Sequence, residues 1–475
     1  MYQEPITIRA DLITGREKIP IDATYISRYS LLVRFLDGNS VSDGANFSKL
    51  VIQINGEIFE LGPCRVISEP NIVGYAGRLI FLRDVYDLER LLFNNKIVKL
   101  QNAFLNLPLV LAYKDKIRQS FKNYTADLTY DLSVYKNIFD SLDAEIQDEP
   151  ENIKKELQKA IIETEGKKFM CFLDDSLKEL ERIVVPFDRE EHARHGFYFR
   201  KQLWNIILCS PFLTRTNLKP RGYAGDSEMM TMIYSNDYRG DSTFSKLMHI
   251  HPLQHSAAQA VRNRRRIVAK MVRDVRKSYT TVPQGKLKVL SVACGPAVEI
   301  QDILLSAEDC EQYRFTLLDQ DRHALFEAAK LINQTEKYLE SKVVVDYQNE
   351  SVRTMLATPQ LKGKWGQFHI IYSMGLFDYL IPRVATAVLG KLYHLLKPGG
   401  EILAGNFHVS NPSKYYMEYW GDWVLYHRTE EEFRNLLGDA SAAEVDVFFE
   451  DTGSQMFLHI KKMDDDRQRT KLSIP

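Results

Sequence analysis

The chain has 475 residues, with 62 Lys and Arg against 63 Asp and Glu, so its formal charge is −1 at neutral pH. A chain of this length is too long to fold around one ordinary hydrophobic core, so two or three domains are expected. A hydrophobic fraction of 45% with 26% charged residues is typical of a folded protein and excludes a disordered one. The balanced charge excludes a global attraction to nucleic acid, so no nucleic-acid partner is expected.

Cysteine usage and the apolar runs indicate the compartment. The five cysteines are widely separated and form no CxxC pair, which argues against a zinc ribbon and a disulfide framework. The first residues, MYQEP, lack the basic and apolar regions of a secretory signal. No apolar run approaches the roughly 20 residues that span a bilayer. The sequence therefore predicts a cytoplasmic protein without an integral membrane segment.

Residues 1–115 are predicted to be rich in β-strands. Short apolar runs recur between Gly, Asn and Asp residues, at 29–35, 50–54, 57–61, 78–82 and 97–100. Asn55-Gly56 between two of these runs is a strong signal for a two-residue hairpin. We expect a small antiparallel barrel or sandwich here, followed by a helix near residues 86–92.

Residues 116–284 are predicted to be helical. Apolar residues recur at helical spacing over 115–146, and Asp148-Glu149-Pro150 interrupts the pattern. Further helices are expected over the ranges 151–184, 189–208 and 256–279. The last carries the basic cluster 262–266, which either steers an anionic acceptor or forms a solvated, ion-paired helix face.

From residue 285 to 475 strands and helices alternate. Strands are expected at 288–292, 314–318, 342–346, 368–372 and 401–404, then at 444–449 and 455–460. Strands separated by helices imply parallel βαβ units, and the closing hairpin adds one antiparallel strand. The fold class is therefore α/β, with a Rossmann-like, seven-stranded sheet at the C-terminal end.

The first strand of this sheet ends in Ala293-Cys294-Gly295-Pro296, where small residues let a ligand approach the backbone. Asp319 ends the next strand, 24 positions after Gly295, near the roughly 20-residue offset at which an acidic residue reaches ribose hydroxyls. The alternative is a turn that needs glycine only for tight packing. The fourth strand leads into another turn, Ser373-Met374-Gly375, which parallel sheets place over the ligand crevice.

Together with the turn Lys397-Pro398-Gly399-Gly400, these motifs resemble the class I S-adenosylmethionine-dependent methyltransferases over residues 286–462. The resemblance implies S-adenosyl-L-methionine as cofactor. It also implies a set of cofactor-binding residues in the turns after the strands: Ala293, Gly295, Pro296, Asp319, Gln320, Glu350, Ser351, Ser373, Met374 and Gly375. The family usually has glycine at positions 293 and 297, and a positive φ at either alanine would strain the backbone.

A narrower resemblance covers residues 219–226 (KPRGYAGD), 257–265 and 405–412. These stretches are similar to bacterial methyltransferases for biosynthesis of the 3-hydroxypalmitic acid methyl ester signal. This resemblance implies methyl transfer to the carboxylate of a hydroxy fatty acid. The loop 219–226 would then act as a lid, with Tyr223 packing and Arg221 binding the carboxylate. The alternative is a structural turn in which Arg221 pairs with a local acid.

Methyl transfer is an in-line displacement that needs positioning, and a carboxylate acceptor is already deprotonated at neutral pH. If the acceptor is a hydroxyl or an amine, His408 is the candidate base; otherwise it fixes local backbone by hydrogen bonds. Six aromatic residues either wall an apolar acceptor pocket or pack within helices: Tyr415, Tyr416, Tyr419, Trp420, Trp423 and Tyr426.

A metal site is considered at His192 and His195, which lie three apart on a predicted helix. No third ligand stands at a recognisable spacing, so no metal is expected.

The N-terminal domain resembles a PilZ-like barrel at residues 27–35 (SRYSLLVRF) and 61–66 (LGPCRV). Typical PilZ domains bind cyclic di-GMP, but only Ser27 of the D-x-S-x-x-G element is present. We therefore expect a structural or interaction domain and no cyclic di-GMP binding.

Two functions remain open. The first is a methyltransferase with a small-molecule or lipid-like acceptor, whose oligomeric state the sequence does not specify. The alternative is a non-catalytic signalling or scaffold protein on a degenerate methyltransferase fold.

Overall fold

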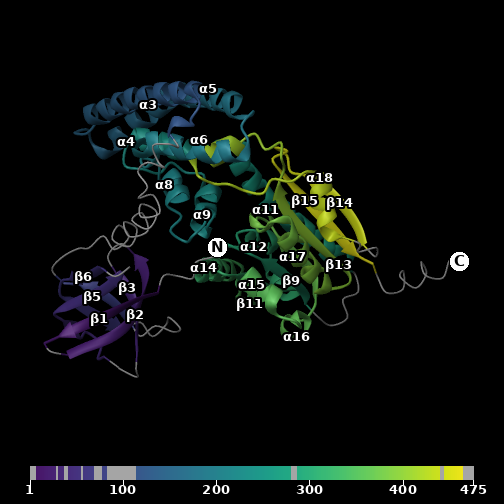
Figure 1. The fold of residues 1–475 in the computed structure, drawn as a ribbon. Helices are drawn as coiled ribbons and strands as arrows, with labels where there is room; N and C mark the ends of the chain where they lie inside the picture. The colour runs from purple at the N-terminus through teal and green to yellow at the C-terminus, as the bar shows by residue number, and fades with distance from the viewer. Residues whose placement is uncertain are drawn as a thin grey trace. The chain divides into compact units, whose positions relative to one another are not determined.

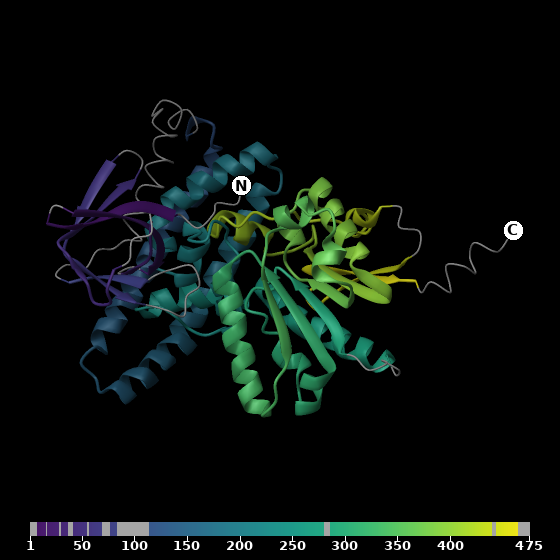
Figure 2. The ribbon, with the colours of Figure 1, turned by 90° about the horizontal axis from the view of Figure 1, so that it is seen from below.

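The computed structural model describes residues 7–15, 17–27, 30–36, 41–54, 57–68, 77–82, 114–279, 286–438 and 443–463. The chain divides into two compact units, residues 1–116 and 117–475, and each is described by itself. Figures 1 and 2 show a β unit at the N-terminal end and a helical region followed by an α/β sheet in the second unit.

The first unit is one antiparallel sheet in the order β4-β7-β8-β3-β2-β1-β5-β6. Its strands are β1 Thr7–Thr14, β2 Glu17–Ser27, β3 Ser30–Phe35, β4 Asn46–Phe47, β5 Lys49–Ile54, β6 Glu57–Leu61, β7 Cys64–Ser68 and β8 Gly77–Phe81. Alternate residues, such as Ala10 and Leu12 on β1, are buried in its core, as the period of a half-buried strand requires. The expected closed barrel is not confirmed, because β4 and β6 are the unpaired ends of an open sheet in the strands described.

The predicted hairpin lies between β5 and β6, where Ile54 pairs with Glu57. The turn Asn55-Gly56 itself lies outside the described residues, as do the predicted helix 86–92 and the predicted strand 97–100. Two positions of the PilZ-like stretch, Arg28 and Tyr29, also lie outside them. The PilZ resemblance therefore stays a prediction.

The second unit begins with helices, as predicted. They are α3 Gln119–Glu145, α4 Glu151–Ile161, the π-helical turn η1 Ile162–Gly166, α5 Lys167–Val184, α6 Arg189–Gln202, α7 Trp204–Ile207, α8 Pro211–Leu218, α9 Ser227–Ser235, α10 Thr243–Gln254 and α11 Ser256–Ser278. Figure 1 shows α3 and α5 running side by side. Pro150 precedes α4 and Asp188 caps α6 with a capping box, so local signals set these helix starts. Within the described chain, none of the helices is both long and apolar enough to cross a membrane.

The α/β part contains the predicted seven-stranded sheet, in the order β11-β10-β9-β12-β13-β15-β14. Its strands are β9 Leu287–Val292, β10 Tyr313–Asp319, β11 Val344–Asn349, β12 Phe368–Ser373, β13 Leu396–Phe407, β14 Ala443–Phe449 and β15 Gln455–Lys462. The strands β9 to β13 pair in parallel, and β15 is antiparallel to both neighbours. The expected antiparallel closing hairpin is confirmed. The prediction of a turn at 397–400 is wrong, because these residues form the irregular start of β13.

Helices cover both faces of this sheet. They are α12 Ile300–Ile303, α13 Ala307–Gln312, α14 Arg322–Leu339, α15 Val352–Ala357, α16 Leu361–Trp365, α17 Pro382–His394 and α18 Glu430–Arg434. One core joins α11, α12 and α14 to the sheet, and another joins α15, α17 and α18 to its other face. Because α11 contributes residues to the core of the helical region and to one core of the sheet, it joins the two.

Candidate cofactor and acceptor site

The candidate site lies at the carboxyl end of the parallel strands, where the strand order reverses. From β9 the chain passes to β10 on one side, while β12 lies on the other side of β9. Open parallel sheets bind ligands in the crevice at this point. The turns that follow β9, β10 and β12 meet here.

The turn after β9 has an unusual backbone. Ala293, Gly295 and Ala297 all have positive φ, at 53°, 56° and 50°. Each alanine in this left-handed region costs about 1–2 kcal/mol, because its Cβ crowds the backbone. The strain expected from the sequence is therefore present, and the turn keeps the shape that a glycine-rich loop would have. A Cβ added at Gly295 would meet no atom within 4 Å, so open space lies in front of this turn.

Asp319 faces the same turn from the end of β10. Its Oδ2 accepts a hydrogen bond from the amide of Gly295 at 2.9 Å, and its Oδ1 accepts one from the amide of Asp321 at 2.9 Å. The residue is 5% exposed, and burial raises the pKa of its carboxyl to about 6. Each carboxylate oxygen can accept two hydrogen bonds, so each retains one acceptor position for a ligand.

The turn after β12 is fixed by neighbouring strands and by α11. Ser373 donates its hydroxyl to the carbonyl of Val292 at 2.9 Å. The carbonyl of Met374 accepts hydrogen bonds from Gln455 at 2.8 Å and from Arg264 at 3.3 Å. Ser373 and Met374, both predicted cofactor residues, therefore have internal partners and hold the shape of the crevice.

The predicted residues after β10 and β11 also have local partners. Asn349 donates its side-chain amide to the carbonyl of Gln320 at 3.0 Å. The carboxylate of Glu350 lies 2.5 Å from the ammonium of Lys364, and Ser351 caps the first turn of α15. The side chains of Asn349, Glu350 and Ser351 are thus engaged within this segment.

Arg221 is not free to bind an acceptor carboxylate. Its guanidinium forms an ion pair with Asp321 at 2.8 Å and donates to the hydroxyl of Ser227 at 2.5 Å. Asp321 is the N-cap of α14, directly after the turn that holds Asp319. The structure therefore favours the alternative in which Arg221 pairs with an acid. That acid is Asp321, which follows β10 of the sheet. The pair ties the loop 219–226 to the candidate cofactor turn.

The same loop packs against the turn after β12. Tyr223 and Tyr379 form an edge-to-face pair with ring centroids 6.1 Å apart. Burial and the charge of Asp319 raise the pKa of Tyr223 above its usual value. A Cβ at Gly225 would lie 2.4 Å from the Tyr379 hydroxyl and 2.6 Å from the ring of Trp423, so only glycine fits there. The loop therefore packs tightly against the turn after β12 and against Trp423.

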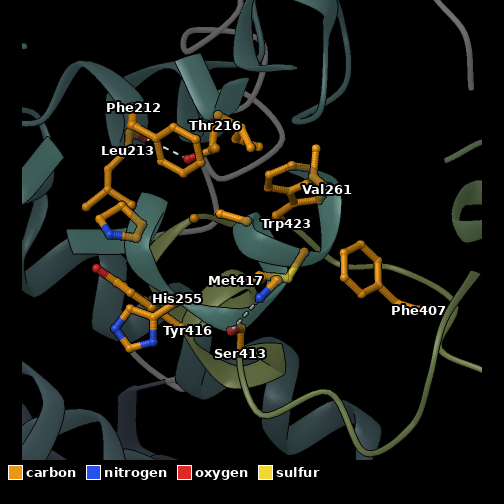
Figure 3. A pocket seen from close by; sticks show the side chains of 15 residues that line it. Phe212, Leu213, Thr216, His255, Val261, Phe407, Ser413, Tyr416, Met417 and Trp423 are labelled. Carbon is orange, nitrogen blue, oxygen red and sulfur yellow. Dashed lines mark hydrogen bonds between the residues drawn. The ribbon is translucent and has the colours of Figure 1, made fainter. Parts of the chain in front are cut away.

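An apolar cavity of about 40 Å³ lies between α8, α11 and the segment after β13 (Figure 3). Its walls include Phe212, Val261, Phe407, Tyr416, Met417 and Trp423. Two of the six predicted wall aromatics, Tyr416 and Trp423, therefore line it. Tyr419 and Trp420 are each 1% exposed and pack in the helical core. This agrees with the alternative in which these aromatic residues pack within the helices.

Hydrogen bonds connect the cavity wall to the sheet edge. The amide of Phe407 donates to Asp378 at 2.7 Å, and the indole of Trp423 donates to the hydroxyl of Tyr379 at 2.9 Å. Both acceptors lie on η2, Phe377–Tyr379, which follows β12. Burial raises the pKa of Asp378 to about 7. The cavity and the crevice thus share one wall.

Arg264 supplies a buried cation at this wall. It is 8% exposed, and its Nε has no hydrogen-bond partner. Its other nitrogens contact the carbonyl of Met374 and the sulfur of Met230. It lies three residues along α11 from Val261, which lines the cavity. Neighbouring residues of the basic cluster 262–266 differ in their partners. Arg265 forms an ion pair with Asp302 at 2.6 Å, whereas Arg264 forms no ion pair with a carboxylate in the described part of the chain.

The three histidines chosen from the sequence have structural partners. His408 bonds through Nδ1 to the hydroxyl of Ser410 at 2.6 Å, which agrees with a role in fixing local backbone. His192 bonds to the hydroxyl of Tyr419 at 3.0 Å. His195 is held by two backbone groups at 2.7 and 3.1 Å. Neither His192 nor His195 belongs to the group of metal-capable side chains that the described residues contain.

No model of a known protein family matches the chain, and no curated protein does either. Among solved structures, the chain is similar to a possible exported protein from Bordetella parapertussis, with 16% identity over 59% of this chain and 90% of that one, at a TM-score of 0.39. It is also similar to magnesium protoporphyrin IX methyltransferase from Synechocystis PCC 6803 (12% identity, 44% and 87% covered, TM-score 0.33). A third is the N-methyltransferase NodS from Bradyrhizobium japonicum (14%, 42% and 96%, TM-score 0.29).

Several of the similar structures are thus methyltransferases, but TM-scores below 0.5 are too low to assign this chain a fold or a function. The fold rests instead on the strand order of the sheet and on its antiparallel seventh strand.

Replacing Ala293 by glycine should stabilise the protein. Ala293 is exposed and has a φ of 53°, so the change removes strain without opening a cavity. We expect the free energy of unfolding to rise by about 0.5–1 kcal/mol, measured by urea denaturation. The matched control is Ala160→Gly on the exposed face of α4, which should lower it by about 1 kcal/mol. Destabilisation by both variants would contradict the strained turn.

Asp319 should make stability depend on pH between about 4 and 6. The unfolded chain releases this proton near pH 4, whereas the folded protein holds it up to about pH 6. The folded state therefore binds more protons in this window, and stability falls as pH rises through it. Relative to Asp319→Asn, the wild type should lose about 2 kcal/mol of unfolding free energy from pH 4 to pH 7. A difference that is constant with pH would exclude the raised pKa.

Proposed function

We propose that the chain is an S-adenosylmethionine-dependent methyltransferase acting on a small or lipid-like acceptor. The observation that carries the proposal is the pairing of Gly295 and Asp319 at the switch point of the sheet. Open space lies in front of Gly295, and the buried carboxylate beside it keeps two acceptor positions. When bound, S-adenosylmethionine supplies an electrophilic methyl group on a sulfonium.

The residues at the crevice fit this cofactor by their chemistry. Asp319 would accept hydrogen bonds from two ribose hydroxyls, which its two remaining acceptor positions match. The strained turn after β9 would hold the amino acid part against its backbone, since its small residues allow close approach. Tyr223 and the loop 219–226 would exclude water from the reacting groups.

For the acceptor, the apolar cavity offers a place for a hydrocarbon group. This volume of about 40 Å³ is too small for a fatty acid chain. A fatty acid chain would therefore require the walls formed by α8 and by residues 416–423 to separate. We propose a hydroxy fatty acid as the acceptor because of the narrower sequence resemblance and the apolar lining.

The acceptor carboxylate is proposed to bind Arg264 rather than Arg221. Arg221 is occupied by Asp321, whereas Arg264 is buried and has an unpartnered Nε. A carboxylate needs no base before methylation at neutral pH. If the acceptor is a hydroxyl, Asp378 suits the role of base better than His408, because its pKa is raised to about 7 and it bonds the cavity wall directly.

Calorimetric titration with S-adenosylmethionine and S-adenosylhomocysteine tests the cofactor site. We expect micromolar binding to the wild type and at least a roughly tenfold loss in Asp319→Ala, because charge-assisted hydrogen bonds are removed. The control is Asp346→Ala on β11 of the same sheet, where the exposed carboxylate pairs with Arg314, and binding should be unchanged. If the wild type binds neither compound, the result would instead favour the alternative of a non-catalytic scaffold protein.

Steady-state kinetics with 3-hydroxy fatty acids tests Arg264. In Arg264→Lys the charge remains but Nε and the planar fork are lost, so the acceptor KM should rise about tenfold. Cofactor affinity should fall by much less, because Arg264 also donates to the carbonyl of Met374 in the turn after β12. Arg265→Lys, the neighbouring position paired with Asp302, is the control and should retain the wild-type KM. An unchanged KM in Arg264→Lys, or an equal loss of cofactor affinity, would remove Arg264 from the acceptor site.

A further inference from the structure

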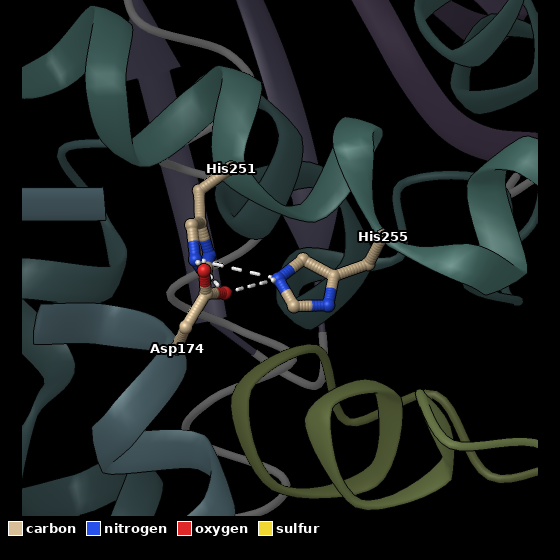
Figure 4. Close-up of side chains that lie close together, drawn as sticks. All are labelled: Asp174, His251 and His255. Carbon is tan, nitrogen blue, oxygen red and sulfur yellow. Dashed lines mark hydrogen bonds and ion pairs between the residues drawn. The ribbon is translucent and has the colours of Figure 1, made fainter. Parts of the chain in front are cut away.

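Three metal-ligating side chains meet in the helical region, away from the cofactor crevice. Asp174 comes from α5, His251 from the last turn of α10, and His255 from the junction of α10 and α11 (Figure 4). Figure 4 shows both imidazole rings turned toward the carboxylate of Asp174. These three residues are called the trio below.

The spacing of the three ligand atoms is that of a metal site. Nε2 of His251 and Nε2 of His255 each lie 3.2 Å from Oδ1 of Asp174. The two Nε2 atoms lie 3.3 Å from each other. Four ligands at 2.0–2.1 Å around a tetrahedral zinc ion are separated by about 3.3–3.4 Å. The trio thus presents one triangular face of such a tetrahedron.

The surrounding structure orients the two rings. His251 is 2% exposed, and its Nδ1 bonds to the hydroxyl of Tyr416 at 2.7 Å. A hydrogen bond to the remote ring nitrogen is how proteins fix a metal-ligating imidazole, since it sets the tautomer and the ring plane. His255 has extended backbone at the break between two helices, with φ −75° and ψ 160°, which turns its ring back toward His251.

We propose that Asp174, His251 and His255 bind one divalent transition-metal ion of the zinc class, with a fourth position left for water or another small ligand. Two imidazole nitrogens and one carboxylate suit zinc and its neighbours, whereas magnesium and calcium prefer oxygen ligands only. The ion would cross-link α5 to the junction of α10 and α11. It would also fix His255 and Tyr416, both of which line the apolar cavity.

The alternative for the trio is a hydrogen-bonded pair of histidines on one acid. If the hydroxyl of Tyr416 donates to Nδ1 of His251, the proton of this ring lies on Nε2 and points to Asp174. That arrangement satisfies the trio without an ion and gives no response to added zinc. The two possibilities therefore differ in a measurable property.

Metal-free protein, prepared with a chelator and kept under reductant, is titrated with zinc chloride. We expect one zinc per chain by calorimetry and a rise in Tm of about 3 °C or more once zinc is well above its Kd. Magnesium should produce no rise. Cobalt in place of zinc should give the visible absorption of a four-coordinate ion. A wild type that binds no zinc and shows no shift would overturn the proposal.

Variants then locate the ion. Asp174→Asn and His255→Gln alter side chains that are 48% and 26% exposed, so the fold should survive while the zinc response is lost. His192→Gln on α6 is the matched control, because it is a half-buried histidine bonded to a tyrosine hydroxyl but lies outside the trio. It should keep the full response.

Cys171→Ser tests for binding at an exposed thiol on α5 and should also keep the response. A response that persists in both trio variants, or that disappears in Cys171→Ser, would place the ion elsewhere. Cofactor binding is measured in parallel. Since the trio does not contact the crevice turns, its failure and that of the methyltransferase proposal are separate results.

Discussion

The hydrogen bond from the Gly295 amide to the Asp319 carboxylate determines the geometry of the sheet edge. It joins the turn after β9 to the end of β10 at 2.9 Å, beside the point where the strand order reverses. The bond offsets two costs at once, because the turn contains alanines at positive φ and the carboxylate is desolvated. The other carboxylate oxygen holds the amide of Asp321, whose own side chain receives Arg221. The loop 219–226 is thus positioned through a chain of contacts that begins at one buried acid.

The helical region forms the second wall of the candidate site. Its long helix α11 covers one face of the sheet and carries Arg264 to the turn after β12. The aromatic segment after β13 returns to the same turn, where the indole of Trp423 meets the hydroxyl of Tyr379. Arg428 reinforces this join from the core by donating to the carbonyl of Phe377 at 2.7 Å. The boundary thus combines apolar surface from the helices with polar groups from the sheet, which suits the proposed acceptor site.

Local patterns predicted the fold of the second unit well and the use of its side chains poorly. Alternating strands and helices predicted the seven-stranded sheet, and the small residues 293–296 predicted the turn that Asp319 holds. Two side-chain contacts, from Arg221 to Asp321 and from Arg264 to Met374, could not be predicted, because each joins residues 100 or more positions apart. The trio shows the same limit. His251 and His255 stand four apart, a spacing that the sequence displays, but Asp174 lies 77 positions before His251 and only the packing of α5 brings it there.

In the first unit, short apolar runs predicted the β-strands. Whether the two edge strands of the sheet pair to close a barrel depends on contacts that sequence spacing does not encode.

His255 is a member of the trio and Tyr416 bonds to His251 beside it, and both residues also line the apolar cavity. Any occupant of the cavity that displaces either side chain must therefore change the affinity of the trio for a cation. Thermodynamic reciprocity then requires the cation to change the affinity of the occupant by the same factor. Two sites that share walls in this way form a coupled pair, in which the concentration of one ligand sets the apparent dissociation constant of the other.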